Sequence, residues 1–313
     1  MTSPVIYWFR QDLRCRDLPG LAAAAATGQP LLCCYILDDH SAGPWAAGGA
    51  SRWWLHHSLA ALSHELQHHG GQLIFLRGPA ERELSALVEQ ASATAVYCSR
   101  VYEPWADALE NRLHRRFSDQ GVAFKRYPGE LLFHPERVRN KAGKPFRVFT
   151  PFWKACRAQA EPHAPAAMPH LDFAATAPGL TLDDLALLPR NPDWAAHWQD
   201  LWQPGAHGAS AALTRFLSHA LDDYAQSRDY PDRAATSLLS PHLHFGEIAP
   251  QRLWLEVRRH CAAHPQLADQ EKKFLSELGW REFSRHLLHH FPQLTETPFK
   301  ANFEHFPWLG DHG

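Results

Sequence analysis

The stretch LLCCYIL at residues 31–37 is a short, continuous run of apolar residues. Such a run is typical of a strand in a sheet that is covered on both faces. Four other short runs are interpreted as strands in the same way: VIYWF (5–9), QLIFL (72–76), AVYC (95–98) and VAFKRY (122–127). The first part of the chain is therefore predicted to contain five strands.

Helical stretches separate these strands, at residues 52–69, 80–90 and 105–119. Strands that alternate with helices favour a parallel sheet with helices packed on it, and thus an α/β fold. No G-x-G-x-x-G pattern follows the first strand, so the usual dinucleotide-binding fingerprint is absent.

The rest of the chain has a different pattern. Seven prolines between residues 162 and 204 indicate a connection that wraps around the protein rather than forming regular elements. Helical spacing of apolar residues returns from residue 208, and residues 250–263 and 270–291 are two further predicted helices. We therefore expect an α/β domain at 1–130, a connection at 131–207 and an all-helical domain at 208–313.

Composition limits the classes of function. The 313 residues are 45% hydrophobic and 20% charged, and no apolar run approaches the length of a membrane span. Six cysteines without a C-x-x-C pair predict a reducing, cytoplasmic protein. The net charge of −2 means that any contact with nucleic acid must come from a local patch. No feature of the sequence points to a protein partner.

The segment TSLLSPHLHFGE at residues 236–247 is a candidate anion site. Three hydroxyls, those of Thr236, Ser237 and Ser240, lie close together in it. Serine before proline is typical of a helix start, so we expect Ser240 to cap a short helix that Gly246 ends. Hydroxyls at the start of a helix favour a bound anion.

A predicted helix at residues 274–287 carries an unusual face. Glu277, Trp280, Arg281 and Ser284 follow helical spacing and share that face. In one interpretation, Glu277 and Arg281 form a surface ion pair and Trp280 packs on a neighbour. In the other, this face is the floor of a site. Trp280 would then stack on a base, Arg281 would hold an anion, and Glu277 would form a hydrogen bond or supply a proton.

The loop before the hydroxyl segment favours the second interpretation. Tyr224, Arg228 and Arg233 precede it closely in the sequence. An aromatic side chain, two arginines, an anion segment and a surface tryptophan thus occur in one helical domain.

Four motifs in order along the chain resemble the class I DNA photolyase/cryptochrome family. They are YWFRQDLRCRDLPGL (7–21), FRVFTPFWKA (146–155), YAQSRDYP followed by TSLLSPHLHFGEI (224–248), and ELGWREFSRHL (277–287). The last motif is more similar to cyclobutane pyrimidine dimer photolyases than to signalling cryptochromes. The resemblance implies a Rossmann-like N-terminal domain and a helical domain that binds FAD.

The resemblance also implies roles for particular residues. Tyr224 and Arg281 would contact FAD, and its diphosphate would be held by Thr236, Ser237, Leu238, Leu239 and Ser240. Arg228 would contact a DNA phosphate. Trp280 would stack on a pyrimidine dimer flipped out of the duplex, with Glu277 hydrogen-bonded to the dimer and Arg281 beside both ligands.

The implied function is light-dependent repair of pyrimidine dimers in DNA, in which the flavin carries the chemistry. The N-terminal domain would hold an antenna pigment, either a folate or a deazaflavin. Tyr102 and Glu103 fall where some relatives contact the folate, although Tyr102 replaces an amide there.

The chain ends in FEHFPWLGDHG (303–313), where members of the family continue. We therefore expect an incomplete FAD-binding domain, in which Trp308 resembles the outermost tryptophan of an electron relay. Two alternatives remain open: a non-catalytic truncated photolyase fragment, and a cryptochrome-type light sensor. A nucleotidyl transferase or electron-transfer flavoprotein is disfavoured, because H-x-G-H and S-G-G-x-x-S are absent.

The pairs His64/His68 and His286/His290 lack a third ligand, so no metal site is predicted.

Overall fold

The computed structural model describes residues 2–159, 161–162, 166–175 and 177–307. One parallel sheet is formed by β1 (Val5–Phe9), β2 (Leu31–Leu37), β3 (Leu73–Arg77), β4 (Ala95–Ser99) and β5 (Ala123–Tyr127). The strand order is β3-β2-β1-β4-β5. The five predicted strands are confirmed, each within one residue at its ends. The order reverses next to β1, as in doubly wound folds, where ligands bind outside the carboxyl ends of the strands.

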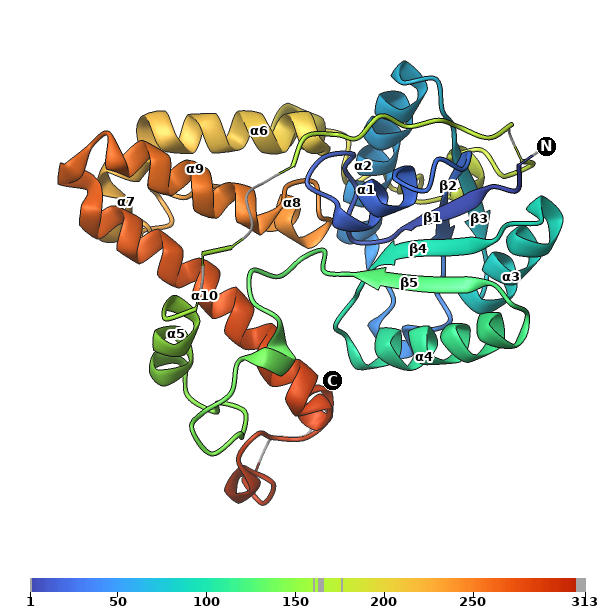
Figure 1. Cartoon of the computed structure of the whole chain (residues 1–313). Helices are drawn as coiled ribbons and strands as arrows, with labels where there is room; N and C mark the ends of the chain where they lie inside the picture. The colour runs from blue at the N-terminus through green and yellow to red at the C-terminus, as the bar shows by residue number, and fades with distance from the viewer. Residues whose placement is uncertain (1, 160, 163–165, 176, 308–313) are drawn as a thin grey trace.

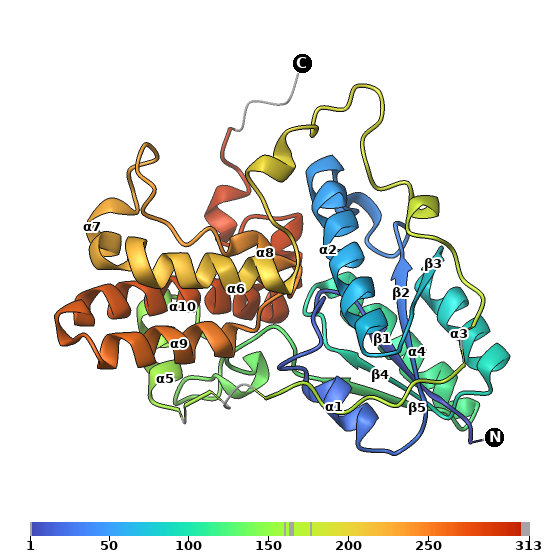
Figure 2. The same ribbon diagram turned by 90° about the horizontal axis from the view of Figure 1, so that it is seen from above.

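Helices cover both faces of the sheet (Figures 1 and 2). On one face lie α1 (Pro19–Ala25) and α2 (Gly49–His68), and on the other lie α3 (Ala80–Ala91) and α4 (Pro104–Asp119). Neighbouring residues of β1 are buried in opposite layers: Tyr7 on the side of α2, Trp8 on the side of α3. Because both faces are covered, β1, β2 and β4 are buried throughout and have no polar alternation, whereas the edge strand β5 is partly exposed.

The helical part lies beside the sheet (Figure 1). It contains α6 (Ala206–Arg215), α7 (Tyr224–Ser227), α8 (Ser240–His244), α9 (Pro250–Ala262) and α10 (Ala268–His290), with α5 (Phe149–Arg157) packed against α10. Single turns of 3₁₀ helix occur at Gly43–Trp45, Pro135–Arg137, Asp183–Leu185, Trp198–Asp200, Leu221–Asp223, Pro265–Leu267, Pro292–Thr295 and Ala301–Phe303, and a π turn at Phe216–Ala220. Over the described residues, no helix is both long enough and apolar enough to span a membrane.

Two short helices were not predicted, and the structure gives the reason. Helix α1 is seven residues of proline, glycine, leucine and alanine, so it shows no alternation of polar and apolar faces. Helix α5 lies in a stretch rich in large apolar residues, and its buried Phe152 and Cys156 belong to a separate core cluster against α10. Helices this short are marginal on their own, so both are stabilised by their packing in the folded chain.

The predicted cap at Ser240 is wrong. Ser240 is the first residue of α8, Leu239 precedes it, and no side chain caps the helix. A capping residue needs an extended backbone, whereas Leu239 has φ −88° and ψ −5°, close to helical values. Gly246 does follow the helix, with a left-handed φ of 66°.

Gly246 lies where the helical part meets the loop after β1. The amide of Leu13 donates to the Phe245 carbonyl at 3.1 Å, and Arg14 Nη1 donates to the Gly246 carbonyl at 2.7 Å. A Cβ atom at Gly246 would lie 2.0 Å from the Gln11 carbonyl oxygen. Only glycine allows this close approach between the two parts.

We therefore expect Gly246→Ala to lower the free energy of unfolding by more than a left-handed alanine alone would. Gly28→Ala is the matched control, because Gly28 has a φ of 68° with no atom within 4 Å of its would-be Cβ. Both variants carry the conformational cost, and Gly246→Ala adds roughly 1–3 kcal/mol of overpacking. Urea unfolding curves measure the difference. Equal destabilisation of the two variants would show that the junction relaxes freely.

Candidate functional site

Trp280 on α10 offers one open aromatic face. The Phe149 ring stacks on the indole with ring centroids 3.7 Å apart and 9° between the planes. Phe283 meets the same indole edge-on at 6.0 Å. Trp280 nevertheless remains 46% exposed. One face of the indole is thus covered and held in orientation, and the exposed area is free for another flat group.

Gly279 permits this arrangement. A Cβ atom at Gly279 would lie 2.6 Å from Cε3 of Trp153 on α5, so the glycine lets α5 approach α10 closely. The Trp153 and Phe149 rings are also nearly parallel, with 13° between their planes and centroids 6.3 Å apart. Three rings from two helices therefore form the Trp280 surface and its support.

Charged groups lie one turn away from Trp280. Glu277 pairs with Arg228, which directly follows α7, and, at 3.1 Å, with Lys273. The Arg228 guanidinium lies 5.5 Å from the centroid of the Tyr224 ring. Burial raises the pKa of Tyr224 to about 12, so its hydroxyl stays protonated at neutral pH. Tyr224, Arg228, Glu277 and Trp280 are thus brought together, as predicted.

The ion pair of Glu277 with Arg281, one of the two sequence interpretations, does not form within the described residues. Arg281 turns to the other side of α10, where Nη1 donates to the Glu130 carbonyl at 2.6 Å and lies 3.2 Å from Glu282. Arg281 thus joins α10 to the segment after β5. Its predicted contact with FAD and DNA stays a prediction.

The hydroxyl segment presents unused polar groups. Thr236 and Ser240 are exposed, and their hydroxyls take part in no hydrogen bond within the described part of the chain. Ser237 Oγ accepts the Leu239 amide at 3.4 Å. Leu238 is 44% exposed and has a φ of 55°, an unusual value for leucine. Leu239 is buried and anchors the segment in the helical core.

A buried carboxylate fixes α10 to the rest of the molecule. Glu282 accepts the amides of Leu132 and Phe133 at 2.8 and 3.1 Å. Burial raises the pKa of Glu282 to about 7, although Arg281 and the two amides act in the opposite direction. The folded protein therefore binds a proton at Glu282 more tightly than the unfolded chain does.

This shift predicts a pH dependence of stability. The contribution of Glu282 is most favourable below its unfolded pKa and declines as the pH rises from about 4.5 to about 7. Glu282→Gln stays neutral and can still accept an amide N–H. We therefore expect its free energy of unfolding, relative to the unmodified chain, to rise between pH 5 and pH 8. Urea unfolding at both values tests this, and a difference that is constant or falls with pH contradicts the raised pKa.

A cavity of about 780 Å³ lies at the carboxyl ends of β1, β2 and β4. It extends to α10 through Arg285, which pairs with Glu103 and, at 3.4 Å, with Glu130. Trp45, 58% exposed, and Trp105 also line it. The family resemblance indicated Glu103 as a position where relatives contact a folate, but no sequence pattern predicted the cavity or its other lining residues. The signal that could have found it is positional, because its residues directly follow predicted strands.

Several buried polar atoms at this cavity lack a hydrogen-bond partner within the described residues. They are Nε1 of Trp8, Nε and Nη1 of Arg10, Oε1 of Gln11 and Oε2 of Glu103. Buried polar groups are normally paired, so donors and acceptors left free at one cavity favour a polar ligand there.

The histidines at the end of α10 are engaged within the protein. The His286 ring is buried and accepts the Phe146 amide at 3.1 Å, while His290 bonds to the Pro135 carbonyl at 3.0 Å. The described residues contain no group of three or more His, Cys, Asp or Glu side chains placed to hold a metal ion.

Trp308, expected at an electron relay, lies outside the described residues.

Comparisons with known proteins agree on one family. Residues 5–170 match the family described as DNA photolyase. Over 318 residues the chain is 43% identical to a deoxyribodipyrimidine photo-lyase of Agrobacterium fabrum, covering 99% of this chain and 64% of that protein. It is 31% identical over 314 residues to cryptochrome-1 of Arabidopsis thaliana, covering 98% of this chain and 46% of that protein.

A solved structure is similar over nearly the whole chain. The crystal structure of a bacterial class III photolyase from Agrobacterium tumefaciens superimposes with a TM-score of 0.93 at 41% identity. The match covers 99% of this chain and 64% of that one. The chain thus spans slightly less than two thirds of the length of these photolyase relatives.

Proposed function

Because the chain belongs to the DNA photolyase family, we propose that it serves in the light-dependent repair of cyclobutane pyrimidine dimers in DNA. The observation that carries the proposal is the Trp280 surface. Its indole is stacked on one face, open on the other, and placed one turn from the Glu277–Arg228 pair. This arrangement suits a planar, hydrogen-bonding, anionic ligand such as a nucleotide.

Each residue has a defined task in this proposal. Trp280 stacks on the dimer once it is flipped out of the duplex, since stacking tolerates any base with an exposed π face. Glu277 accepts a hydrogen bond from a pyrimidine ring N–H. Arg228, whose side chain is 22% exposed, holds a phosphate of the damaged strand. These contacts orient the dimer, and the stack of Phe149 on Trp280 excludes water from one side.

We propose FAD as the cofactor, with Tyr224 and Arg281 as contacts and the diphosphate on Thr236, Ser237, Leu238, Leu239 and Ser240. The free, exposed hydroxyls of Thr236 and Ser240 support this, because they can donate to phosphate oxygens. Reduced FAD held there would supply a light-driven electron that opens the cyclobutane ring and would take the electron back afterwards, so that the repair has no net change of oxidation state. The chain's own part is to hold the diphosphate and to keep the dimer in place.

Replacing Trp280 tests the stacking role. We expect Trp280→Ala to weaken binding to a duplex with one pyrimidine dimer by about 1–3 kcal/mol, with little change for the undamaged duplex. Trp194→Ala is the matched control, since Trp194 is also 46% exposed but lies in the connection. Fluorescence anisotropy titrations measure both affinities. Unchanged affinity for the dimer, in a folded Trp280→Ala protein, would remove Trp280 from the site.

The cofactor and the reaction need separate measurements. An absorption spectrum of the purified chain, and of the supernatant after denaturation, identifies any bound flavin or antenna pigment. Illumination of the reduced protein with dimer-containing DNA should then restore intact pyrimidines. A flavin-loaded chain that binds the dimer but leaves it intact would contradict repair.

We further propose that the cavity at the sheet edge holds the antenna pigment, a folate or a deazaflavin. Both pigments present a ring edge with N–H and C=O groups, which matches the free donors of Arg10 and the free acceptors of Gln11 and Glu103. The exposed Trp45 at the rim can stack on the ring system.

We also place the protein in a reducing compartment, the cytoplasm, supported by its six free cysteines.

Glu103→Gln tests the pigment site. The amide keeps the shape but loses one acceptor, so we expect a lower content of antenna pigment with the flavin content unchanged. Glu256→Gln on α9 is the control, because Glu256 is not among the residues that line the cavity. Absorption spectra distinguish a folate from a deazaflavin. A proportional loss of both pigments, or unchanged antenna content, would contradict this assignment.

A further inference from the structure

A buried carboxylate that the proposed function does not use lies just after α8. The Glu247 side chain is fully buried, and each of its oxygens accepts a hydrogen bond. Nε1 of Trp54, on α2, donates to one oxygen at 2.9 Å, and Nδ1 of His242, in α8, donates to the other. Burial of a carboxylate is costly unless such donors satisfy it. We refer to Trp54, His242 and Glu247 as the Glu247 cluster.

The Glu247 cluster joins the helical part to the α/β part. Trp54 is buried, and rings of the helical part pack against its indole. The His242 ring meets the indole edge-on with ring centroids 5.1 Å apart. The Phe245 ring is nearly parallel to it, with 10° between the planes and centroids 6.2 Å apart. Ring packing and a directed hydrogen bond therefore both hold α8 against α2.

Helix α8 depends on contacts at its end. It has five residues, and among the described residues no side chain caps its start. A helix this short is not stable by itself. His242 and Glu247 are linked twice, because the Glu247 amide donates to the His242 carbonyl at 2.9 Å and the two side chains are also bonded. The end of α8 is thus anchored, and the direction of the helix follows from this anchor.

The start of α8 carries groups proposed to hold the FAD diphosphate. Ser240 is the first residue of the helix and precedes His242 by two residues. The exposed hydroxyls of Thr236 and Ser240 form no hydrogen bond within the described part of the chain. Their position therefore depends on the path of the backbone, which the buried Leu239 and the Glu247 cluster hold on either side of Ser240.

We propose that Glu247 is a positioning residue for the cofactor. Its carboxylate holds His242, and His242 sets α8 so that the hydroxyls of Thr236 and Ser240 meet the FAD diphosphate. The proposal rests on the proposed function and extends it to a residue outside the proposed contacts. Such a role has a large effect, because a misplacement of about 1 Å caused by a distant residue can cost a factor of roughly 100.

Replacing Glu247 tests the role of its hydrogen bonds. Glu247→Ala leaves Trp54 and His242 without their acceptor, so we expect FAD binding to weaken by about 10- to 100-fold. Titration of FAD fluorescence with the flavin-free protein measures the affinity. Glu247→Gln should restore most of it, because its oxygen accepts from Trp54 and its amide N–H can donate to the other tautomer of His242. A Glu247→Gln variant as weak as Glu247→Ala would show that the charge is required instead, and would overturn the proposal.

Hydrogen exchange of the flavin-free protein tests the role of α8 separately. The amides of Leu243 and Phe245 donate to the carbonyls of Leu239 and Pro241 at 2.9 and 3.0 Å. In Glu247→Ala we expect these amides to exchange at least about tenfold faster, with α10 unchanged, because exchange reports local opening. Weaker FAD binding without faster exchange in α8, or faster exchange with unchanged FAD binding, contradicts positioning through this helix.

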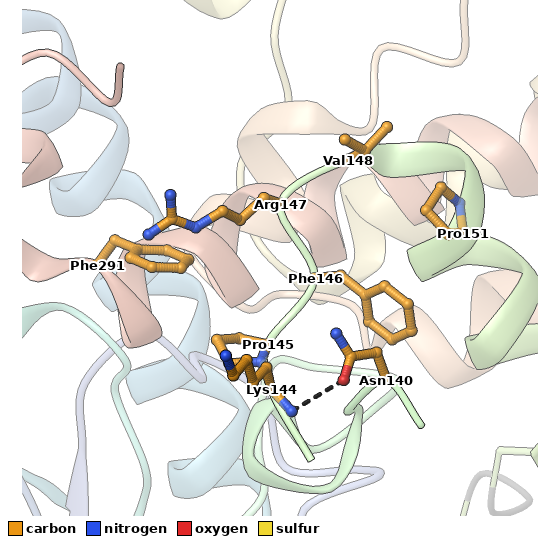
Figure 3. A pocket seen from close by; sticks show the side chains of 8 residues that line it. All are labelled: Asn140, Lys144, Pro145, Phe146, Arg147, Val148, Pro151 and Phe291. Atoms are coloured by element: carbon orange, nitrogen blue, oxygen red, sulfur yellow. Dashed lines mark hydrogen bonds between the residues drawn. The ribbon is translucent and has the colours of Figure 1, made fainter. Parts of the chain in front are cut away.

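Asn140→Ala is the matched control. Figure 3 shows the Asn140 side chain accepting the Lys144 amide, at 3.0 Å, and the same oxygen accepts the Ala142 amide at 2.9 Å. Like Glu247, Asn140 holds a short segment through two N–H donors, but residues 140–144 include none of the proposed FAD contacts. FAD affinity and exchange in α8 should match those of the unmodified chain. An equal loss in this control would indicate general destabilisation and overturn the proposal.

The same measurements separate this proposal from the proposed function. If the unmodified chain binds no FAD while Glu247→Ala speeds exchange in α8, the proposed cofactor fails and Glu247 keeps only a structural role. If FAD binds equally to the unmodified chain and to Glu247→Ala, the cofactor stands and the positioning role is overturned.

Discussion

The arrangement of this molecule depends on one interaction. The buried Glu282 carboxylate accepts hydrogen bonds from two backbone amides. Leu132 and Phe133 follow the last strand of the sheet, so this contact ties α10 to the α/β part. A carboxylate without these donors would be costly to bury. Arg281 binds both Glu282 and the Glu130 carbonyl and completes the junction. Gly246 closes the same boundary at another point, by direct approach of two backbones.

Helix α10 consequently carries residues of both proposed sites. Trp280 and Glu277 face α5 and α7, whereas Arg285, further along α10, reaches the cavity at the ends of β1, β2 and β4. Because α10 is fixed by the Glu282 junction, the distance between the proposed dimer site and the proposed pigment cavity is set by a rigid element. A site on a helix held in this way keeps its geometry better than one on loops.

The junction and residues 137–157 differ in how their basic side chains are paired. At the junction, the arginines are neutralised by partners such as Glu103 and Glu130, and they stabilise the contact between the two parts. Along residues 137–157, by contrast, seven basic side chains are exposed and form no ion pair with a carboxylate among the described residues. A net charge close to zero therefore conceals a strongly uneven surface, which is why composition alone excluded only a protein that is basic throughout.

Apolar runs and helical spacing are local properties, so the amino-acid sequence was enough to predict the parallel sheet, the long helices, and the shared face of Glu277 and Trp280. That Tyr224 and Arg228 belong to the same site was implied only by the resemblance to a known family. Other features arise between residues far apart in the chain: the direction in which Arg281 turns, the stack of Phe149 on Trp280, and the cavity shared by Arg10, Gln11 and Glu103. The Ser240 cap was wrong for the same reason, because the backbone of Leu239 is set by its burial in the helical core. Packing between distant residues overrides local preference at these positions, so they could be known only from the folded chain.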